Sequence, residues 1–385
     1  MDFTLTAAQE AFREEVRSWL KTNIPRDWQA RAMGSADVPR PEAYDAMRAW
    51  QRKLYDAGYI GLTWPKEYGG RGLTFLEEMI LHEEMALAKA PPILNILGIG
   101  MAGPTIIAYG TEAQKQRYPA RILSCEEIWC QGYSEPNAGS DLASLQTRAV
   151  KDGEHWVVNG QKVWTSFAHI ADYMMLLART DPAAPKHKGI SVLLIPTDTE
   201  GLVRRPFASI VAPDDLDFNE VFFNDVRVPR ANLIGALNGG WKVAHGSLGH
   251  ERSMLWMSFA EWLDDLIRDA PSDADWYAKL LMDAQALRLL GYRQLSGERD
   301  PAELSMLKVL GSEAVQSAAL NALEECGAES LIHPATTAPY NHMNLEDLTA
   351  SWFERYARSF GGTIAGGTSE IQRNIIAERI LGLPR

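Results

Sequence analysis

The sequence predicts an α+β protein with an all-α N-terminal domain, a middle β-barrel or β-sandwich domain, and a C-terminal domain like a four-helix bundle. Apolar residues recur at helical spacing in the first part of the chain, alternate with polar residues in the middle, and return to helical spacing from Gly240. A chain of 385 residues is also long for one hydrophobic core. We place the domains at residues 1–125, 126–235 and 236–385.

The N-terminal domain contains three predicted helices. Thr6 and Gln9 form a capping-box pattern, and the helix that begins there is expected to end before Pro25. Two further helical patterns follow at about residues 42–57 and 74–90, and each is closed by glycine or proline.

An uncharged segment follows these helices. Residues 90–111 are numerous enough to span a bilayer, but three prolines and four glycines interrupt them. Within the segment, Gly98–Gly103 matches the glycine pattern of dinucleotide-binding proteins, although Pro104 follows at once and no strand pattern precedes it. We therefore predict close packing of buried helices, with neither a membrane span nor a dinucleotide site.

The middle and C-terminal domains are predicted from alternation and periodicity. Turn signals at Asp152-Gly153 and Asn159-Gly160 predict two successive hairpins. Further strands are expected at residues 173–179, 189–196 and 220–228. Helices that pack as an antiparallel bundle are expected at 241–268, 274–296, 301–326, 345–360 and 369–381.

Composition excludes several classes of function. The 38 basic and 50 acidic residues give a net charge of -12, which disfavours nucleic acid or an anionic membrane as a partner. Any anionic ligand must therefore find a local basic patch. His82-Glu83-Glu84 resembles the start of a zinc-protease helix, but Ala86 stands where the second histidine is needed, so we expect no metal site.

Cysteine usage and the N-terminus indicate a reducing compartment. Cys125, Cys130 and Cys326 are too few and too scattered for a disulfide framework. The first residues have neither the basic and apolar regions of a signal peptide nor the composition of a transit peptide. We expect a cytoplasmic protein.

Three polar stretches are candidates for a binding site. The first, Gln131–Asp141, carries hydroxyl, amide and carboxylate groups on a backbone interrupted by glycine and proline, so its N–H groups cannot all enter a helix or sheet. The second, Lys162–Ser166, has one large ring and two hydroxyls at the end of a strand pattern. The third, Gly366–Glu370, opens a helical pattern. A ring and hydroxyls suit a flat heteroaromatic cofactor, although each stretch alone also fits a turn, a core residue or a helix start.

Together and in this order, the stretches resemble the acyl-CoA dehydrogenase family over nearly the whole chain. The resemblance rests on residues 134–141, 159–164, 218–229 and 367–373. It implies the acyl-CoA dehydrogenase fold and FAD-dependent α,β-desaturation of an acyl-CoA thioester in fatty acid or steroid degradation, with electrons passed to an electron-transfer flavoprotein. The alternatives on this scaffold are an acyl-CoA oxidase, or a non-catalytic subunit that completes a partner's site.

The resemblance also assigns residues by position. It places FAD against Gln131, Tyr133, Ser134, Gly139, Ser140, Trp164, Ser166, Thr368 and Glu370. It places the acyl-CoA substrate against Ser140, Gly366 and Arg252, where Gly366 could offer its backbone N–H to the thioester oxygen.

The catalytic base departs from the commonest family pattern. Many members have a glutamate directly before the Gly-Thr of the last motif, where this chain has Gly366. The isovaleryl and long-chain types instead carry the base on the helix after the β domain, where this chain has Glu251. We therefore expect Glu251 to be the base. The alternative is a structural role in which it pairs with Arg252 or a neighbouring helix.

A second departure concerns assembly. Family members usually hold the ADP half of a neighbouring subunit's FAD through two motifs, and the corresponding stretches here, about 267–277 and Glu324–Ala328, lack them. One explanation is an α2β2 heterotetramer with a homologous subunit, as in the steroid side-chain dehydrogenases to which the chain is similar. The other is a homotetramer that binds ADP through other residues.

The acyl and CoA subsites are less specified. Candidates for the CoA phosphates are Arg204, Arg205 and Lys242, although each also fits a solvated surface charge. Residues near Glu251 that could line a wide apolar pocket, or belong to an ordinary core, are Trp241, Met254, Trp256, Met257 and Phe259.

Overall fold

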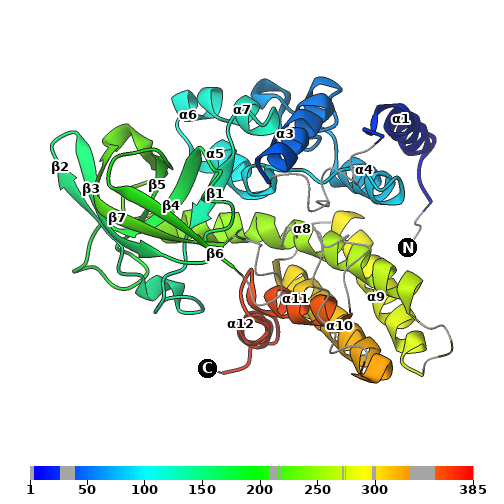
Figure 1. Cartoon of the computed structure of the whole chain (residues 1–385). Helices are drawn as coiled ribbons and strands as arrows, with labels where there is room; N and C mark the ends of the chain where they lie inside the picture. Colours follow the sequence, from blue (N-terminus) through cyan, green and yellow to red (C-terminus); the bar gives the residue numbers. More distant parts are fainter. Residues whose placement is uncertain are drawn as a thin grey trace.

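A computed structural model describes most of the chain. The described residues are 4–26, 40–208, 216, 218–270, 273, 275–296, 301–328 and 352–384, and inside helices the side chains of 40–43, 250–254, 296 and 301–302 are not described. Figure 1 shows a β-sheet at one end of the molecule and helices over the remainder. The long helix α8 runs from the sheet between the N-terminal helices and the other C-terminal helices, and it contacts all three parts.

The N-terminal part is helical, as predicted. The capping box at Thr6 and Gln9 is confirmed: the Thr6 Oγ1 accepts a hydrogen bond from the Gln9 N–H at 3.3 Å, and the Gln9 side chain accepts one from the Thr6 N–H at 2.9 Å. The elements are α1 (Ala7–Asn23), α3 (Arg40–Asp56), η1 (Lys66–Tyr68), α4 (Phe75–Leu87), η2 (Gly98–Ala102), α5 (Gly103–Tyr109), α6 (Glu112–Arg117) and α7 (Pro119–Leu123).

Glycines in the uncharged segment allow close packing, as predicted. A Cβ at Gly103 would lie only 1.9 Å from the Trp64 ring, and one at Gly98 would lie 2.4 Å from the Asn95 side chain. The segment forms the π-helical turn η2 followed by α5, so the glycine pattern belongs to helix packing. Among the described residues, no helix is long and apolar enough to cross a membrane.

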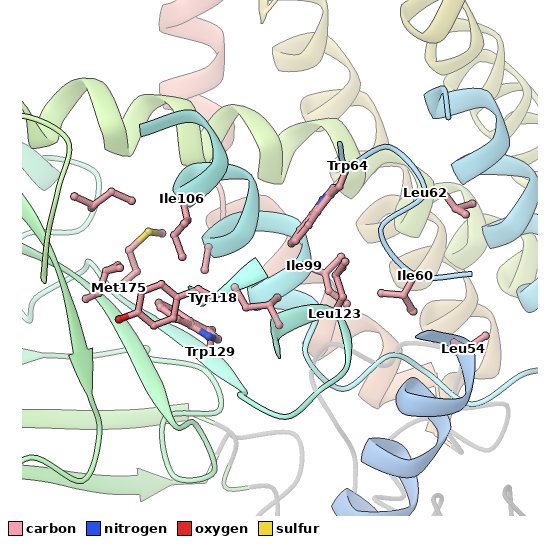
Figure 2. Close-up of a cluster of buried hydrophobic side chains, with 14 of the residues drawn as sticks. Leu54, Ile60, Leu62, Trp64, Ile99, Ile106, Tyr118, Leu123, Trp129 and Met175 are labelled. Atoms are coloured by element: carbon pink, nitrogen blue, oxygen red, sulfur yellow. The ribbon is translucent and has the colours of Figure 1, made fainter. Parts of the chain in front are cut away.

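One hydrophobic cluster joins the N-terminal helices to the sheet. Figure 2 shows Trp64, Ile99 and Leu123 on the helical side, with Tyr118 leading to Trp129 and Met175 on the strands. Burial of such large side chains contributes about 1.5–3 kcal/mol each. The cluster therefore fixes the position of the helices relative to the strand that carries the first polar stretch.

Asn95 supplements this cluster with buried hydrogen bonds. Its Nδ2 donates to the carbonyl of Ile122 at 3.0 Å and to that of Glu127 at 2.8 Å, while its Oδ1 accepts from the Trp129 N–H at 2.9 Å. Because these groups are buried, each must be satisfied within the protein. One side chain thus connects α7 to the first strand.

The middle part is a mixed sheet of eight strands. The order is β6-β7-β3-β2-β4-β5-β8, and β1 pairs with β4 in parallel. The strands are β1 (Trp129–Gly132), β2 (Arg148–Asp152), β3 (His155–Lys162), β4 (Tyr173–Arg179), β5 (Ile190–Pro196), β6 (Leu202–Phe207), β7 (Phe218–Pro229) and β8 (Leu233–Ile234). Short 3-10 turns lie at η3 (Leu142–Ser144) and η4 (Arg230–Asn232).

The first predicted hairpin is present, but the second turn is not. β2 and β3 pair in antiparallel around Asp152-Gly153. The prediction of a turn at Asn159-Gly160 is wrong, because β3 continues through it with a register shift between Val158 and Gly160. A Cβ at Gly160 would lie 2.5 Å from the Thr147 Oγ1, so the glycine serves a close approach inside a strand.

The C-terminal part is a helical bundle, as predicted. Helix α10 packs against α8, α9, α11 and α12. The elements are α8 (Gly240–Asp269), α9 (Tyr277–Ser296), α10 (Pro301–Cys326), α11 (Trp352–Ile364), α12 (Ser369–Ile375) and the π-helical turn η6 (Ile376–Ile380). The helix expected at 345–360 is present from Trp352, and its first predicted residues lie outside the described part.

Candidate active site

A buried ion pair joins the first two polar stretches. Lys162, which is fully buried, lies at the end of β3, and its Nζ donates to Glu135 Oε1 and to the Tyr133 carbonyl, both at 2.8 Å. The other bonds of Glu135 are to backbone, because its carboxylate accepts from the N–H groups of Gln146 at 2.7 Å and Thr147 at 2.8 Å. Glu135 therefore has three charge-assisted hydrogen-bond partners.

Burial and the mutual attraction of the two charges act on the pKa of both members of this pair. Burial lowers the pKa of Lys162 to about 8. Burial alone would raise the pKa of Glu135, but the nearby Lys162 charge and the hydrogen bonds it accepts hold that pKa below its ordinary value. A buried pair with this many hydrogen bonds fixes the loop in one position relative to the strand.

The loop and the strand end are also joined by a hydrogen bond between backbone groups. The Val163 N–H donates to the Ser134 carbonyl at 3.0 Å. Ser134 and Ser166 are both partly buried. The first and second stretches are therefore held side by side where Ser134 meets Val163.

Trp164 is unusually placed for so large an apolar side chain. It is 60% exposed, and its backbone has φ +60°, a left-handed conformation that tryptophan rarely adopts. Its ring lies edge to face with Phe207 at 5.2 Å and with Phe218 at 5.5 Å between centroids. The protein thus holds an aromatic ring at the surface, packed against the rings of Phe207 and Phe218.

The other residues of the first stretch expected at the cofactor differ in burial. Gln131 is on β1, and its buried Nε2 has no hydrogen-bond partner among the described residues. Tyr133 is buried, whereas Gly139 and Ser140 are exposed at the tip of the loop. A Cβ at Gly139 would meet no atom within 4 Å, so there is open space beside it.

The third stretch forms a tight turn before α12. Gly366 and Gly367 have φ +66° and +92°, and the Gln372 Nε2 donates to the Gly366 carbonyl at 2.9 Å. Thr368 caps the helix by accepting the Ile371 N–H at 3.3 Å. Glu370 is exposed, and its pKa is lowered by hydrogen bonds from its own N–H and from Thr368.

Helix α8 carries the expected base. The backbone of Glu251 and Arg252 lies within this helix, and their side chains are outside the described part. One turn earlier, Ser247 is fully buried and its hydroxyl has no partner among the described atoms. At Gly249 a Cβ would meet nothing within 4 Å, so the helix borders open space at this position. The third stretch begins α12, and α12 packs against α10, which also packs against α8.

Residues proposed for the acyl and CoA subsites divide into two groups. Trp256, Met257 and Phe259 are buried in the core of the helical bundle, which favours their structural role, while Met254 lies outside the described side chains. Trp241 is partly buried and Lys242 is exposed at the start of α8.

The two arginine candidates have structural partners. Arg204 donates to the carbonyls of Ala168 and Ala171, at 3.0 and 3.2 Å. The guanidinium of Arg205 lies over the ring of Phe222, 4.9 Å from its centroid. These contacts give both arginines structural partners within the middle part of the chain.

The ion pair between Glu135 and Lys162 was not predicted from the sequence. Both lie inside the candidate stretches, where the carboxylates were expected to contribute to binding and the lysine was given no role. The available signal was a charged residue within each stretch, next to apolar residues. Their pairing across 27 positions could not be read from local pattern.

Comparisons with known proteins cover nearly the whole chain. Family models described as the acyl-CoA dehydrogenase N-terminal, middle and C-terminal domains match residues 6–126, 130–226 and 238–381. The chain is 38% identical to acyl-CoA dehydrogenase IpdE1 of Mycobacterium tuberculosis, over 98% of each chain.

Solved structures give the same result. The ChsE4-ChsE5 complex from Mycobacterium tuberculosis contains a chain that is 33% identical, with a TM-score of 0.79 and 100% of both chains covered. The steroid ACAD Tcur3481-Tcur3483 matches at 32% identity with a TM-score of 0.80, again over 100% of both chains. The chain therefore belongs to the acyl-CoA dehydrogenase family, whose members are FAD-dependent flavoproteins.

Proposed function

We propose that this chain desaturates an acyl-CoA thioester between its α- and β-carbons, with Glu251 as the base and an electron-transfer flavoprotein as the electron acceptor. One observation supports the proposal most. The buried pair of Glu135 and Lys162 fixes the Ser134 loop beside the strand end that carries Trp164, so two of the three candidate cofactor stretches are held together.

The residues of these two stretches fit FAD. An exposed ring held by Phe207 and Phe218 offers a face or edge to an isoalloxazine, and the buried Gln131 amide is a hydrogen-bond donor that needs a partner. We propose that Gln131, Tyr133, Ser134, Gly139, Ser140, Trp164, Ser166, Thr368 and Glu370 hold the cofactor. When bound, FAD supplies the acceptor for the hydride that leaves the β-carbon.

The chain's own groups would carry out the proton transfer. Glu251 takes the proton from the α-carbon, and the electrons of that C–H bond form the new double bond as the hydride leaves. We propose that the Gly366 N–H donates to the thioester oxygen, since a glycine at φ +66° can present its amide without a side chain. Loss of one such donor costs roughly 3 kcal/mol of transition-state stabilisation. Ser140 and Arg252 are proposed to contact the substrate.

Reduction of the flavin by an acyl-CoA tests this function. We expect anaerobic addition of the correct acyl-CoA to bleach the yellow absorbance of the purified holoenzyme. A panel of short linear, branched and steroid side-chain thioesters identifies the acyl group. Slow reoxidation in air, accelerated by an electron-transfer flavoprotein, is expected for a dehydrogenase. Rapid reoxidation by oxygen would instead identify an acyl-CoA oxidase, and no bleaching by any thioester would contradict the proposal.

We also propose that the chain works in an α2β2 heterotetramer with a homologous subunit. The residues around 267–277 lack the usual ADP-binding motif, and a similar solved structure is a complex, ChsE4-ChsE5. The described C-terminal helices also leave apolar side chains uncovered, with Phe360 44%, Ile364 61% and Leu381 64% exposed.

Expression with and without a homologous partner tests the assembly. For the chain alone we expect less than one FAD per chain and no tetramer, because the partner supplies contacts to the ADP half. Co-expression with the partner is expected to restore a tetramer and full FAD content. Size-exclusion chromatography with mass determination and flavin absorbance measures both quantities. A fully flavinated homotetramer from the chain alone would contradict this assembly.

A further inference from the structure

We propose that Lys308, on α10, positions the Gly366 amide for the thioester oxygen. Lys308 is a positioning residue, because it acts through the backbone at the end of α11. The inference rests on the proposed function, in which the Gly366 N–H donates to the substrate. It adds the residue that holds this N–H in place.

Lys308 closes the C-terminal end of α11. The residue is buried in the helical bundle, with only 1% of its surface exposed. Its Nζ donates to the carbonyl of Thr363, the penultimate residue of α11, at 3.0 Å. The last four carbonyls of an α-helix have no N–H partner within the helix, and a positive charge beside them is favourable. The buried ammonium group therefore anchors the backbone where α11 ends.

The glycine turn that follows is held on both sides. Four residues, 365–368, join α11 to α12, and Gly366 and Gly367 have φ +66° and +92°. Lys308 holds the backbone before these glycines. After them, the fully buried Gln372 donates to the Gly366 carbonyl at 2.9 Å. Because glycine can adopt many backbone conformations, these two anchors are needed to set the direction of the Gly366 N–H.

The charge of Lys308 acts at both ends of this turn. The pKa of Glu370, in the first turn of α12, is lowered by hydrogen bonds from its own N–H and from Thr368, with a further contribution from the charge of Lys308. The ammonium group is therefore near the start of α12 as well as the end of α11.

The Gly366 amide itself is available to a ligand. The two anchors use the carbonyls of Thr363 and Gly366, and among the residues that the structure describes no protein group accepts a hydrogen bond from the Gly366 N–H. A donor whose direction is fixed before the substrate binds stabilises developing negative charge without a cost of reorganisation. Lys308 thus assists the reaction by orienting this donor.

Close packing connects this turn to the helix that carries the proposed base. A Cβ at Gly362 of α11 would lie 3.2 Å from the Phe259 ring, and a Cβ at Gly311 of α10 would lie 2.7 Å from the same ring. Phe259 follows Glu251 by eight residues of α8, which corresponds to about 12 Å along the helix. The contacts of Phe259 therefore fix the end of α11 relative to α8.

Lys308→Met tests the proposal, because methionine retains most of the length of the side chain and removes its charge and its donor. We expect an acyl-CoA to reduce the flavin of this variant roughly 10-fold more slowly than that of the wild-type holoenzyme, measured by anaerobic stopped-flow absorbance. Affinity for free coenzyme A, which has no thioester, is expected to be unchanged. Wild-type reduction kinetics in Lys308→Met would overturn the proposal.

Hydrogen exchange provides a second measurement that needs no turnover. In the holoenzyme without substrate, we expect the peptide that contains Gly366 to exchange its amide hydrogens faster in Lys308→Met than in the wild type, because the turn has lost one anchor. Mass spectrometry measures this exchange. Equal exchange in the two proteins would overturn the proposal. If no acyl-CoA bleaches the wild-type flavin, the proposed function fails, and the exchange still decides whether Lys308 holds the turn.

The preceding residue of α10 provides a matched control. Leu307 is buried in the core of the bundle, so Leu307→Val is expected to lower the midpoint of urea unfolding. It should leave both the rate of flavin reduction and the exchange at the turn unchanged, because it keeps the Lys308 anchor. If Leu307→Val slows reduction as much as Lys308→Met does, the effect is one of general stability and the proposal is wrong.

Discussion

Replacement of Glu251 by glutamine is expected to slow reduction of the flavin by acyl-CoA by about 10²–10⁴-fold, because an amide cannot accept the α-proton. Affinity for coenzyme A should change little, since the variant removes the base and leaves the carrier contacts intact. Anaerobic stopped-flow absorbance measures the reduction rate, and titration with coenzyme A measures the affinity. The two readouts separate lost proton transfer from lost binding.

A carboxylate on the same helix provides the control. Asp269 lies at the other end of α8, about 27 Å from Glu251 along the helix, and pairs with Arg355 at 2.5 Å. Asp269→Asn removes the same charge from the same helix and should reduce the flavin at the wild-type rate. If Glu251→Gln also bleaches at the wild-type rate, the base lies elsewhere and the chain's role as a partner-completing subunit gains support.

The second large effect is expected at the buried pair that joins the first two polar stretches. Lys162→Met leaves the Glu135 carboxylate buried without its counter-charge, which costs about 3–5 kcal/mol. We expect a lower midpoint of urea unfolding and loss of FAD, because the Ser134 loop is then no longer held beside Trp164. Lys151→Met, on the exposed side of the neighbouring strand β2, is the matched control and should retain both properties. Wild-type stability and FAD content in Lys162→Met would refute this role.

The same pair predicts a pH dependence. Since the folded pKa of Glu135 lies below its ordinary value of about 4.3, its contribution to stability is present above that value and is lost as the pH falls through the folded pKa. The wild-type protein should therefore lose stability in this acid range more steeply than the double variant Glu135→Gln, Lys162→Met. Unfolding midpoints measured across the range test this difference. The double variant should also recover part of the stability lost in Lys162→Met.

Local chemistry in the sequence was enough to predict many elements. A capping box needs only residues three positions apart, so the start of α1 at Thr6 was readable. The turn at Asp152-Gly153 needs only two residues and flanking alternation. The glycines at Gly98 and Gly103 were also interpreted correctly, because the absence of a preceding strand pattern excluded a dinucleotide site.

Features that depend on distant partners were not predictable in this way. Asn159-Gly160 has the sequence of a turn, yet Thr147 and strand β7 draw the same residues into a long strand with a bulge. Trp164 adopts a left-handed backbone conformation that no local signal favours. The pairing of Glu135 with Lys162 likewise follows from the sheet, which brings together residues that are far apart in the chain.

Helix α8 is unbroken from Gly240 to Asp269, and this continuity fixes the proposed base at Glu251 relative to the end of the helix that contacts the sheet. Trp241 and Glu251 lie on the same helix, so the distance between their Cα atoms and the angle between them around the helix axis are set by helical geometry. Insertion of a single residue between them would rotate the position of Glu251 by about 100° around the helix axis. It would also increase the distance between the two residues along the axis by about 1.5 Å. The spacing between these two residues is therefore set by the backbone of one helix, and substitutions in the surrounding helices leave it unchanged.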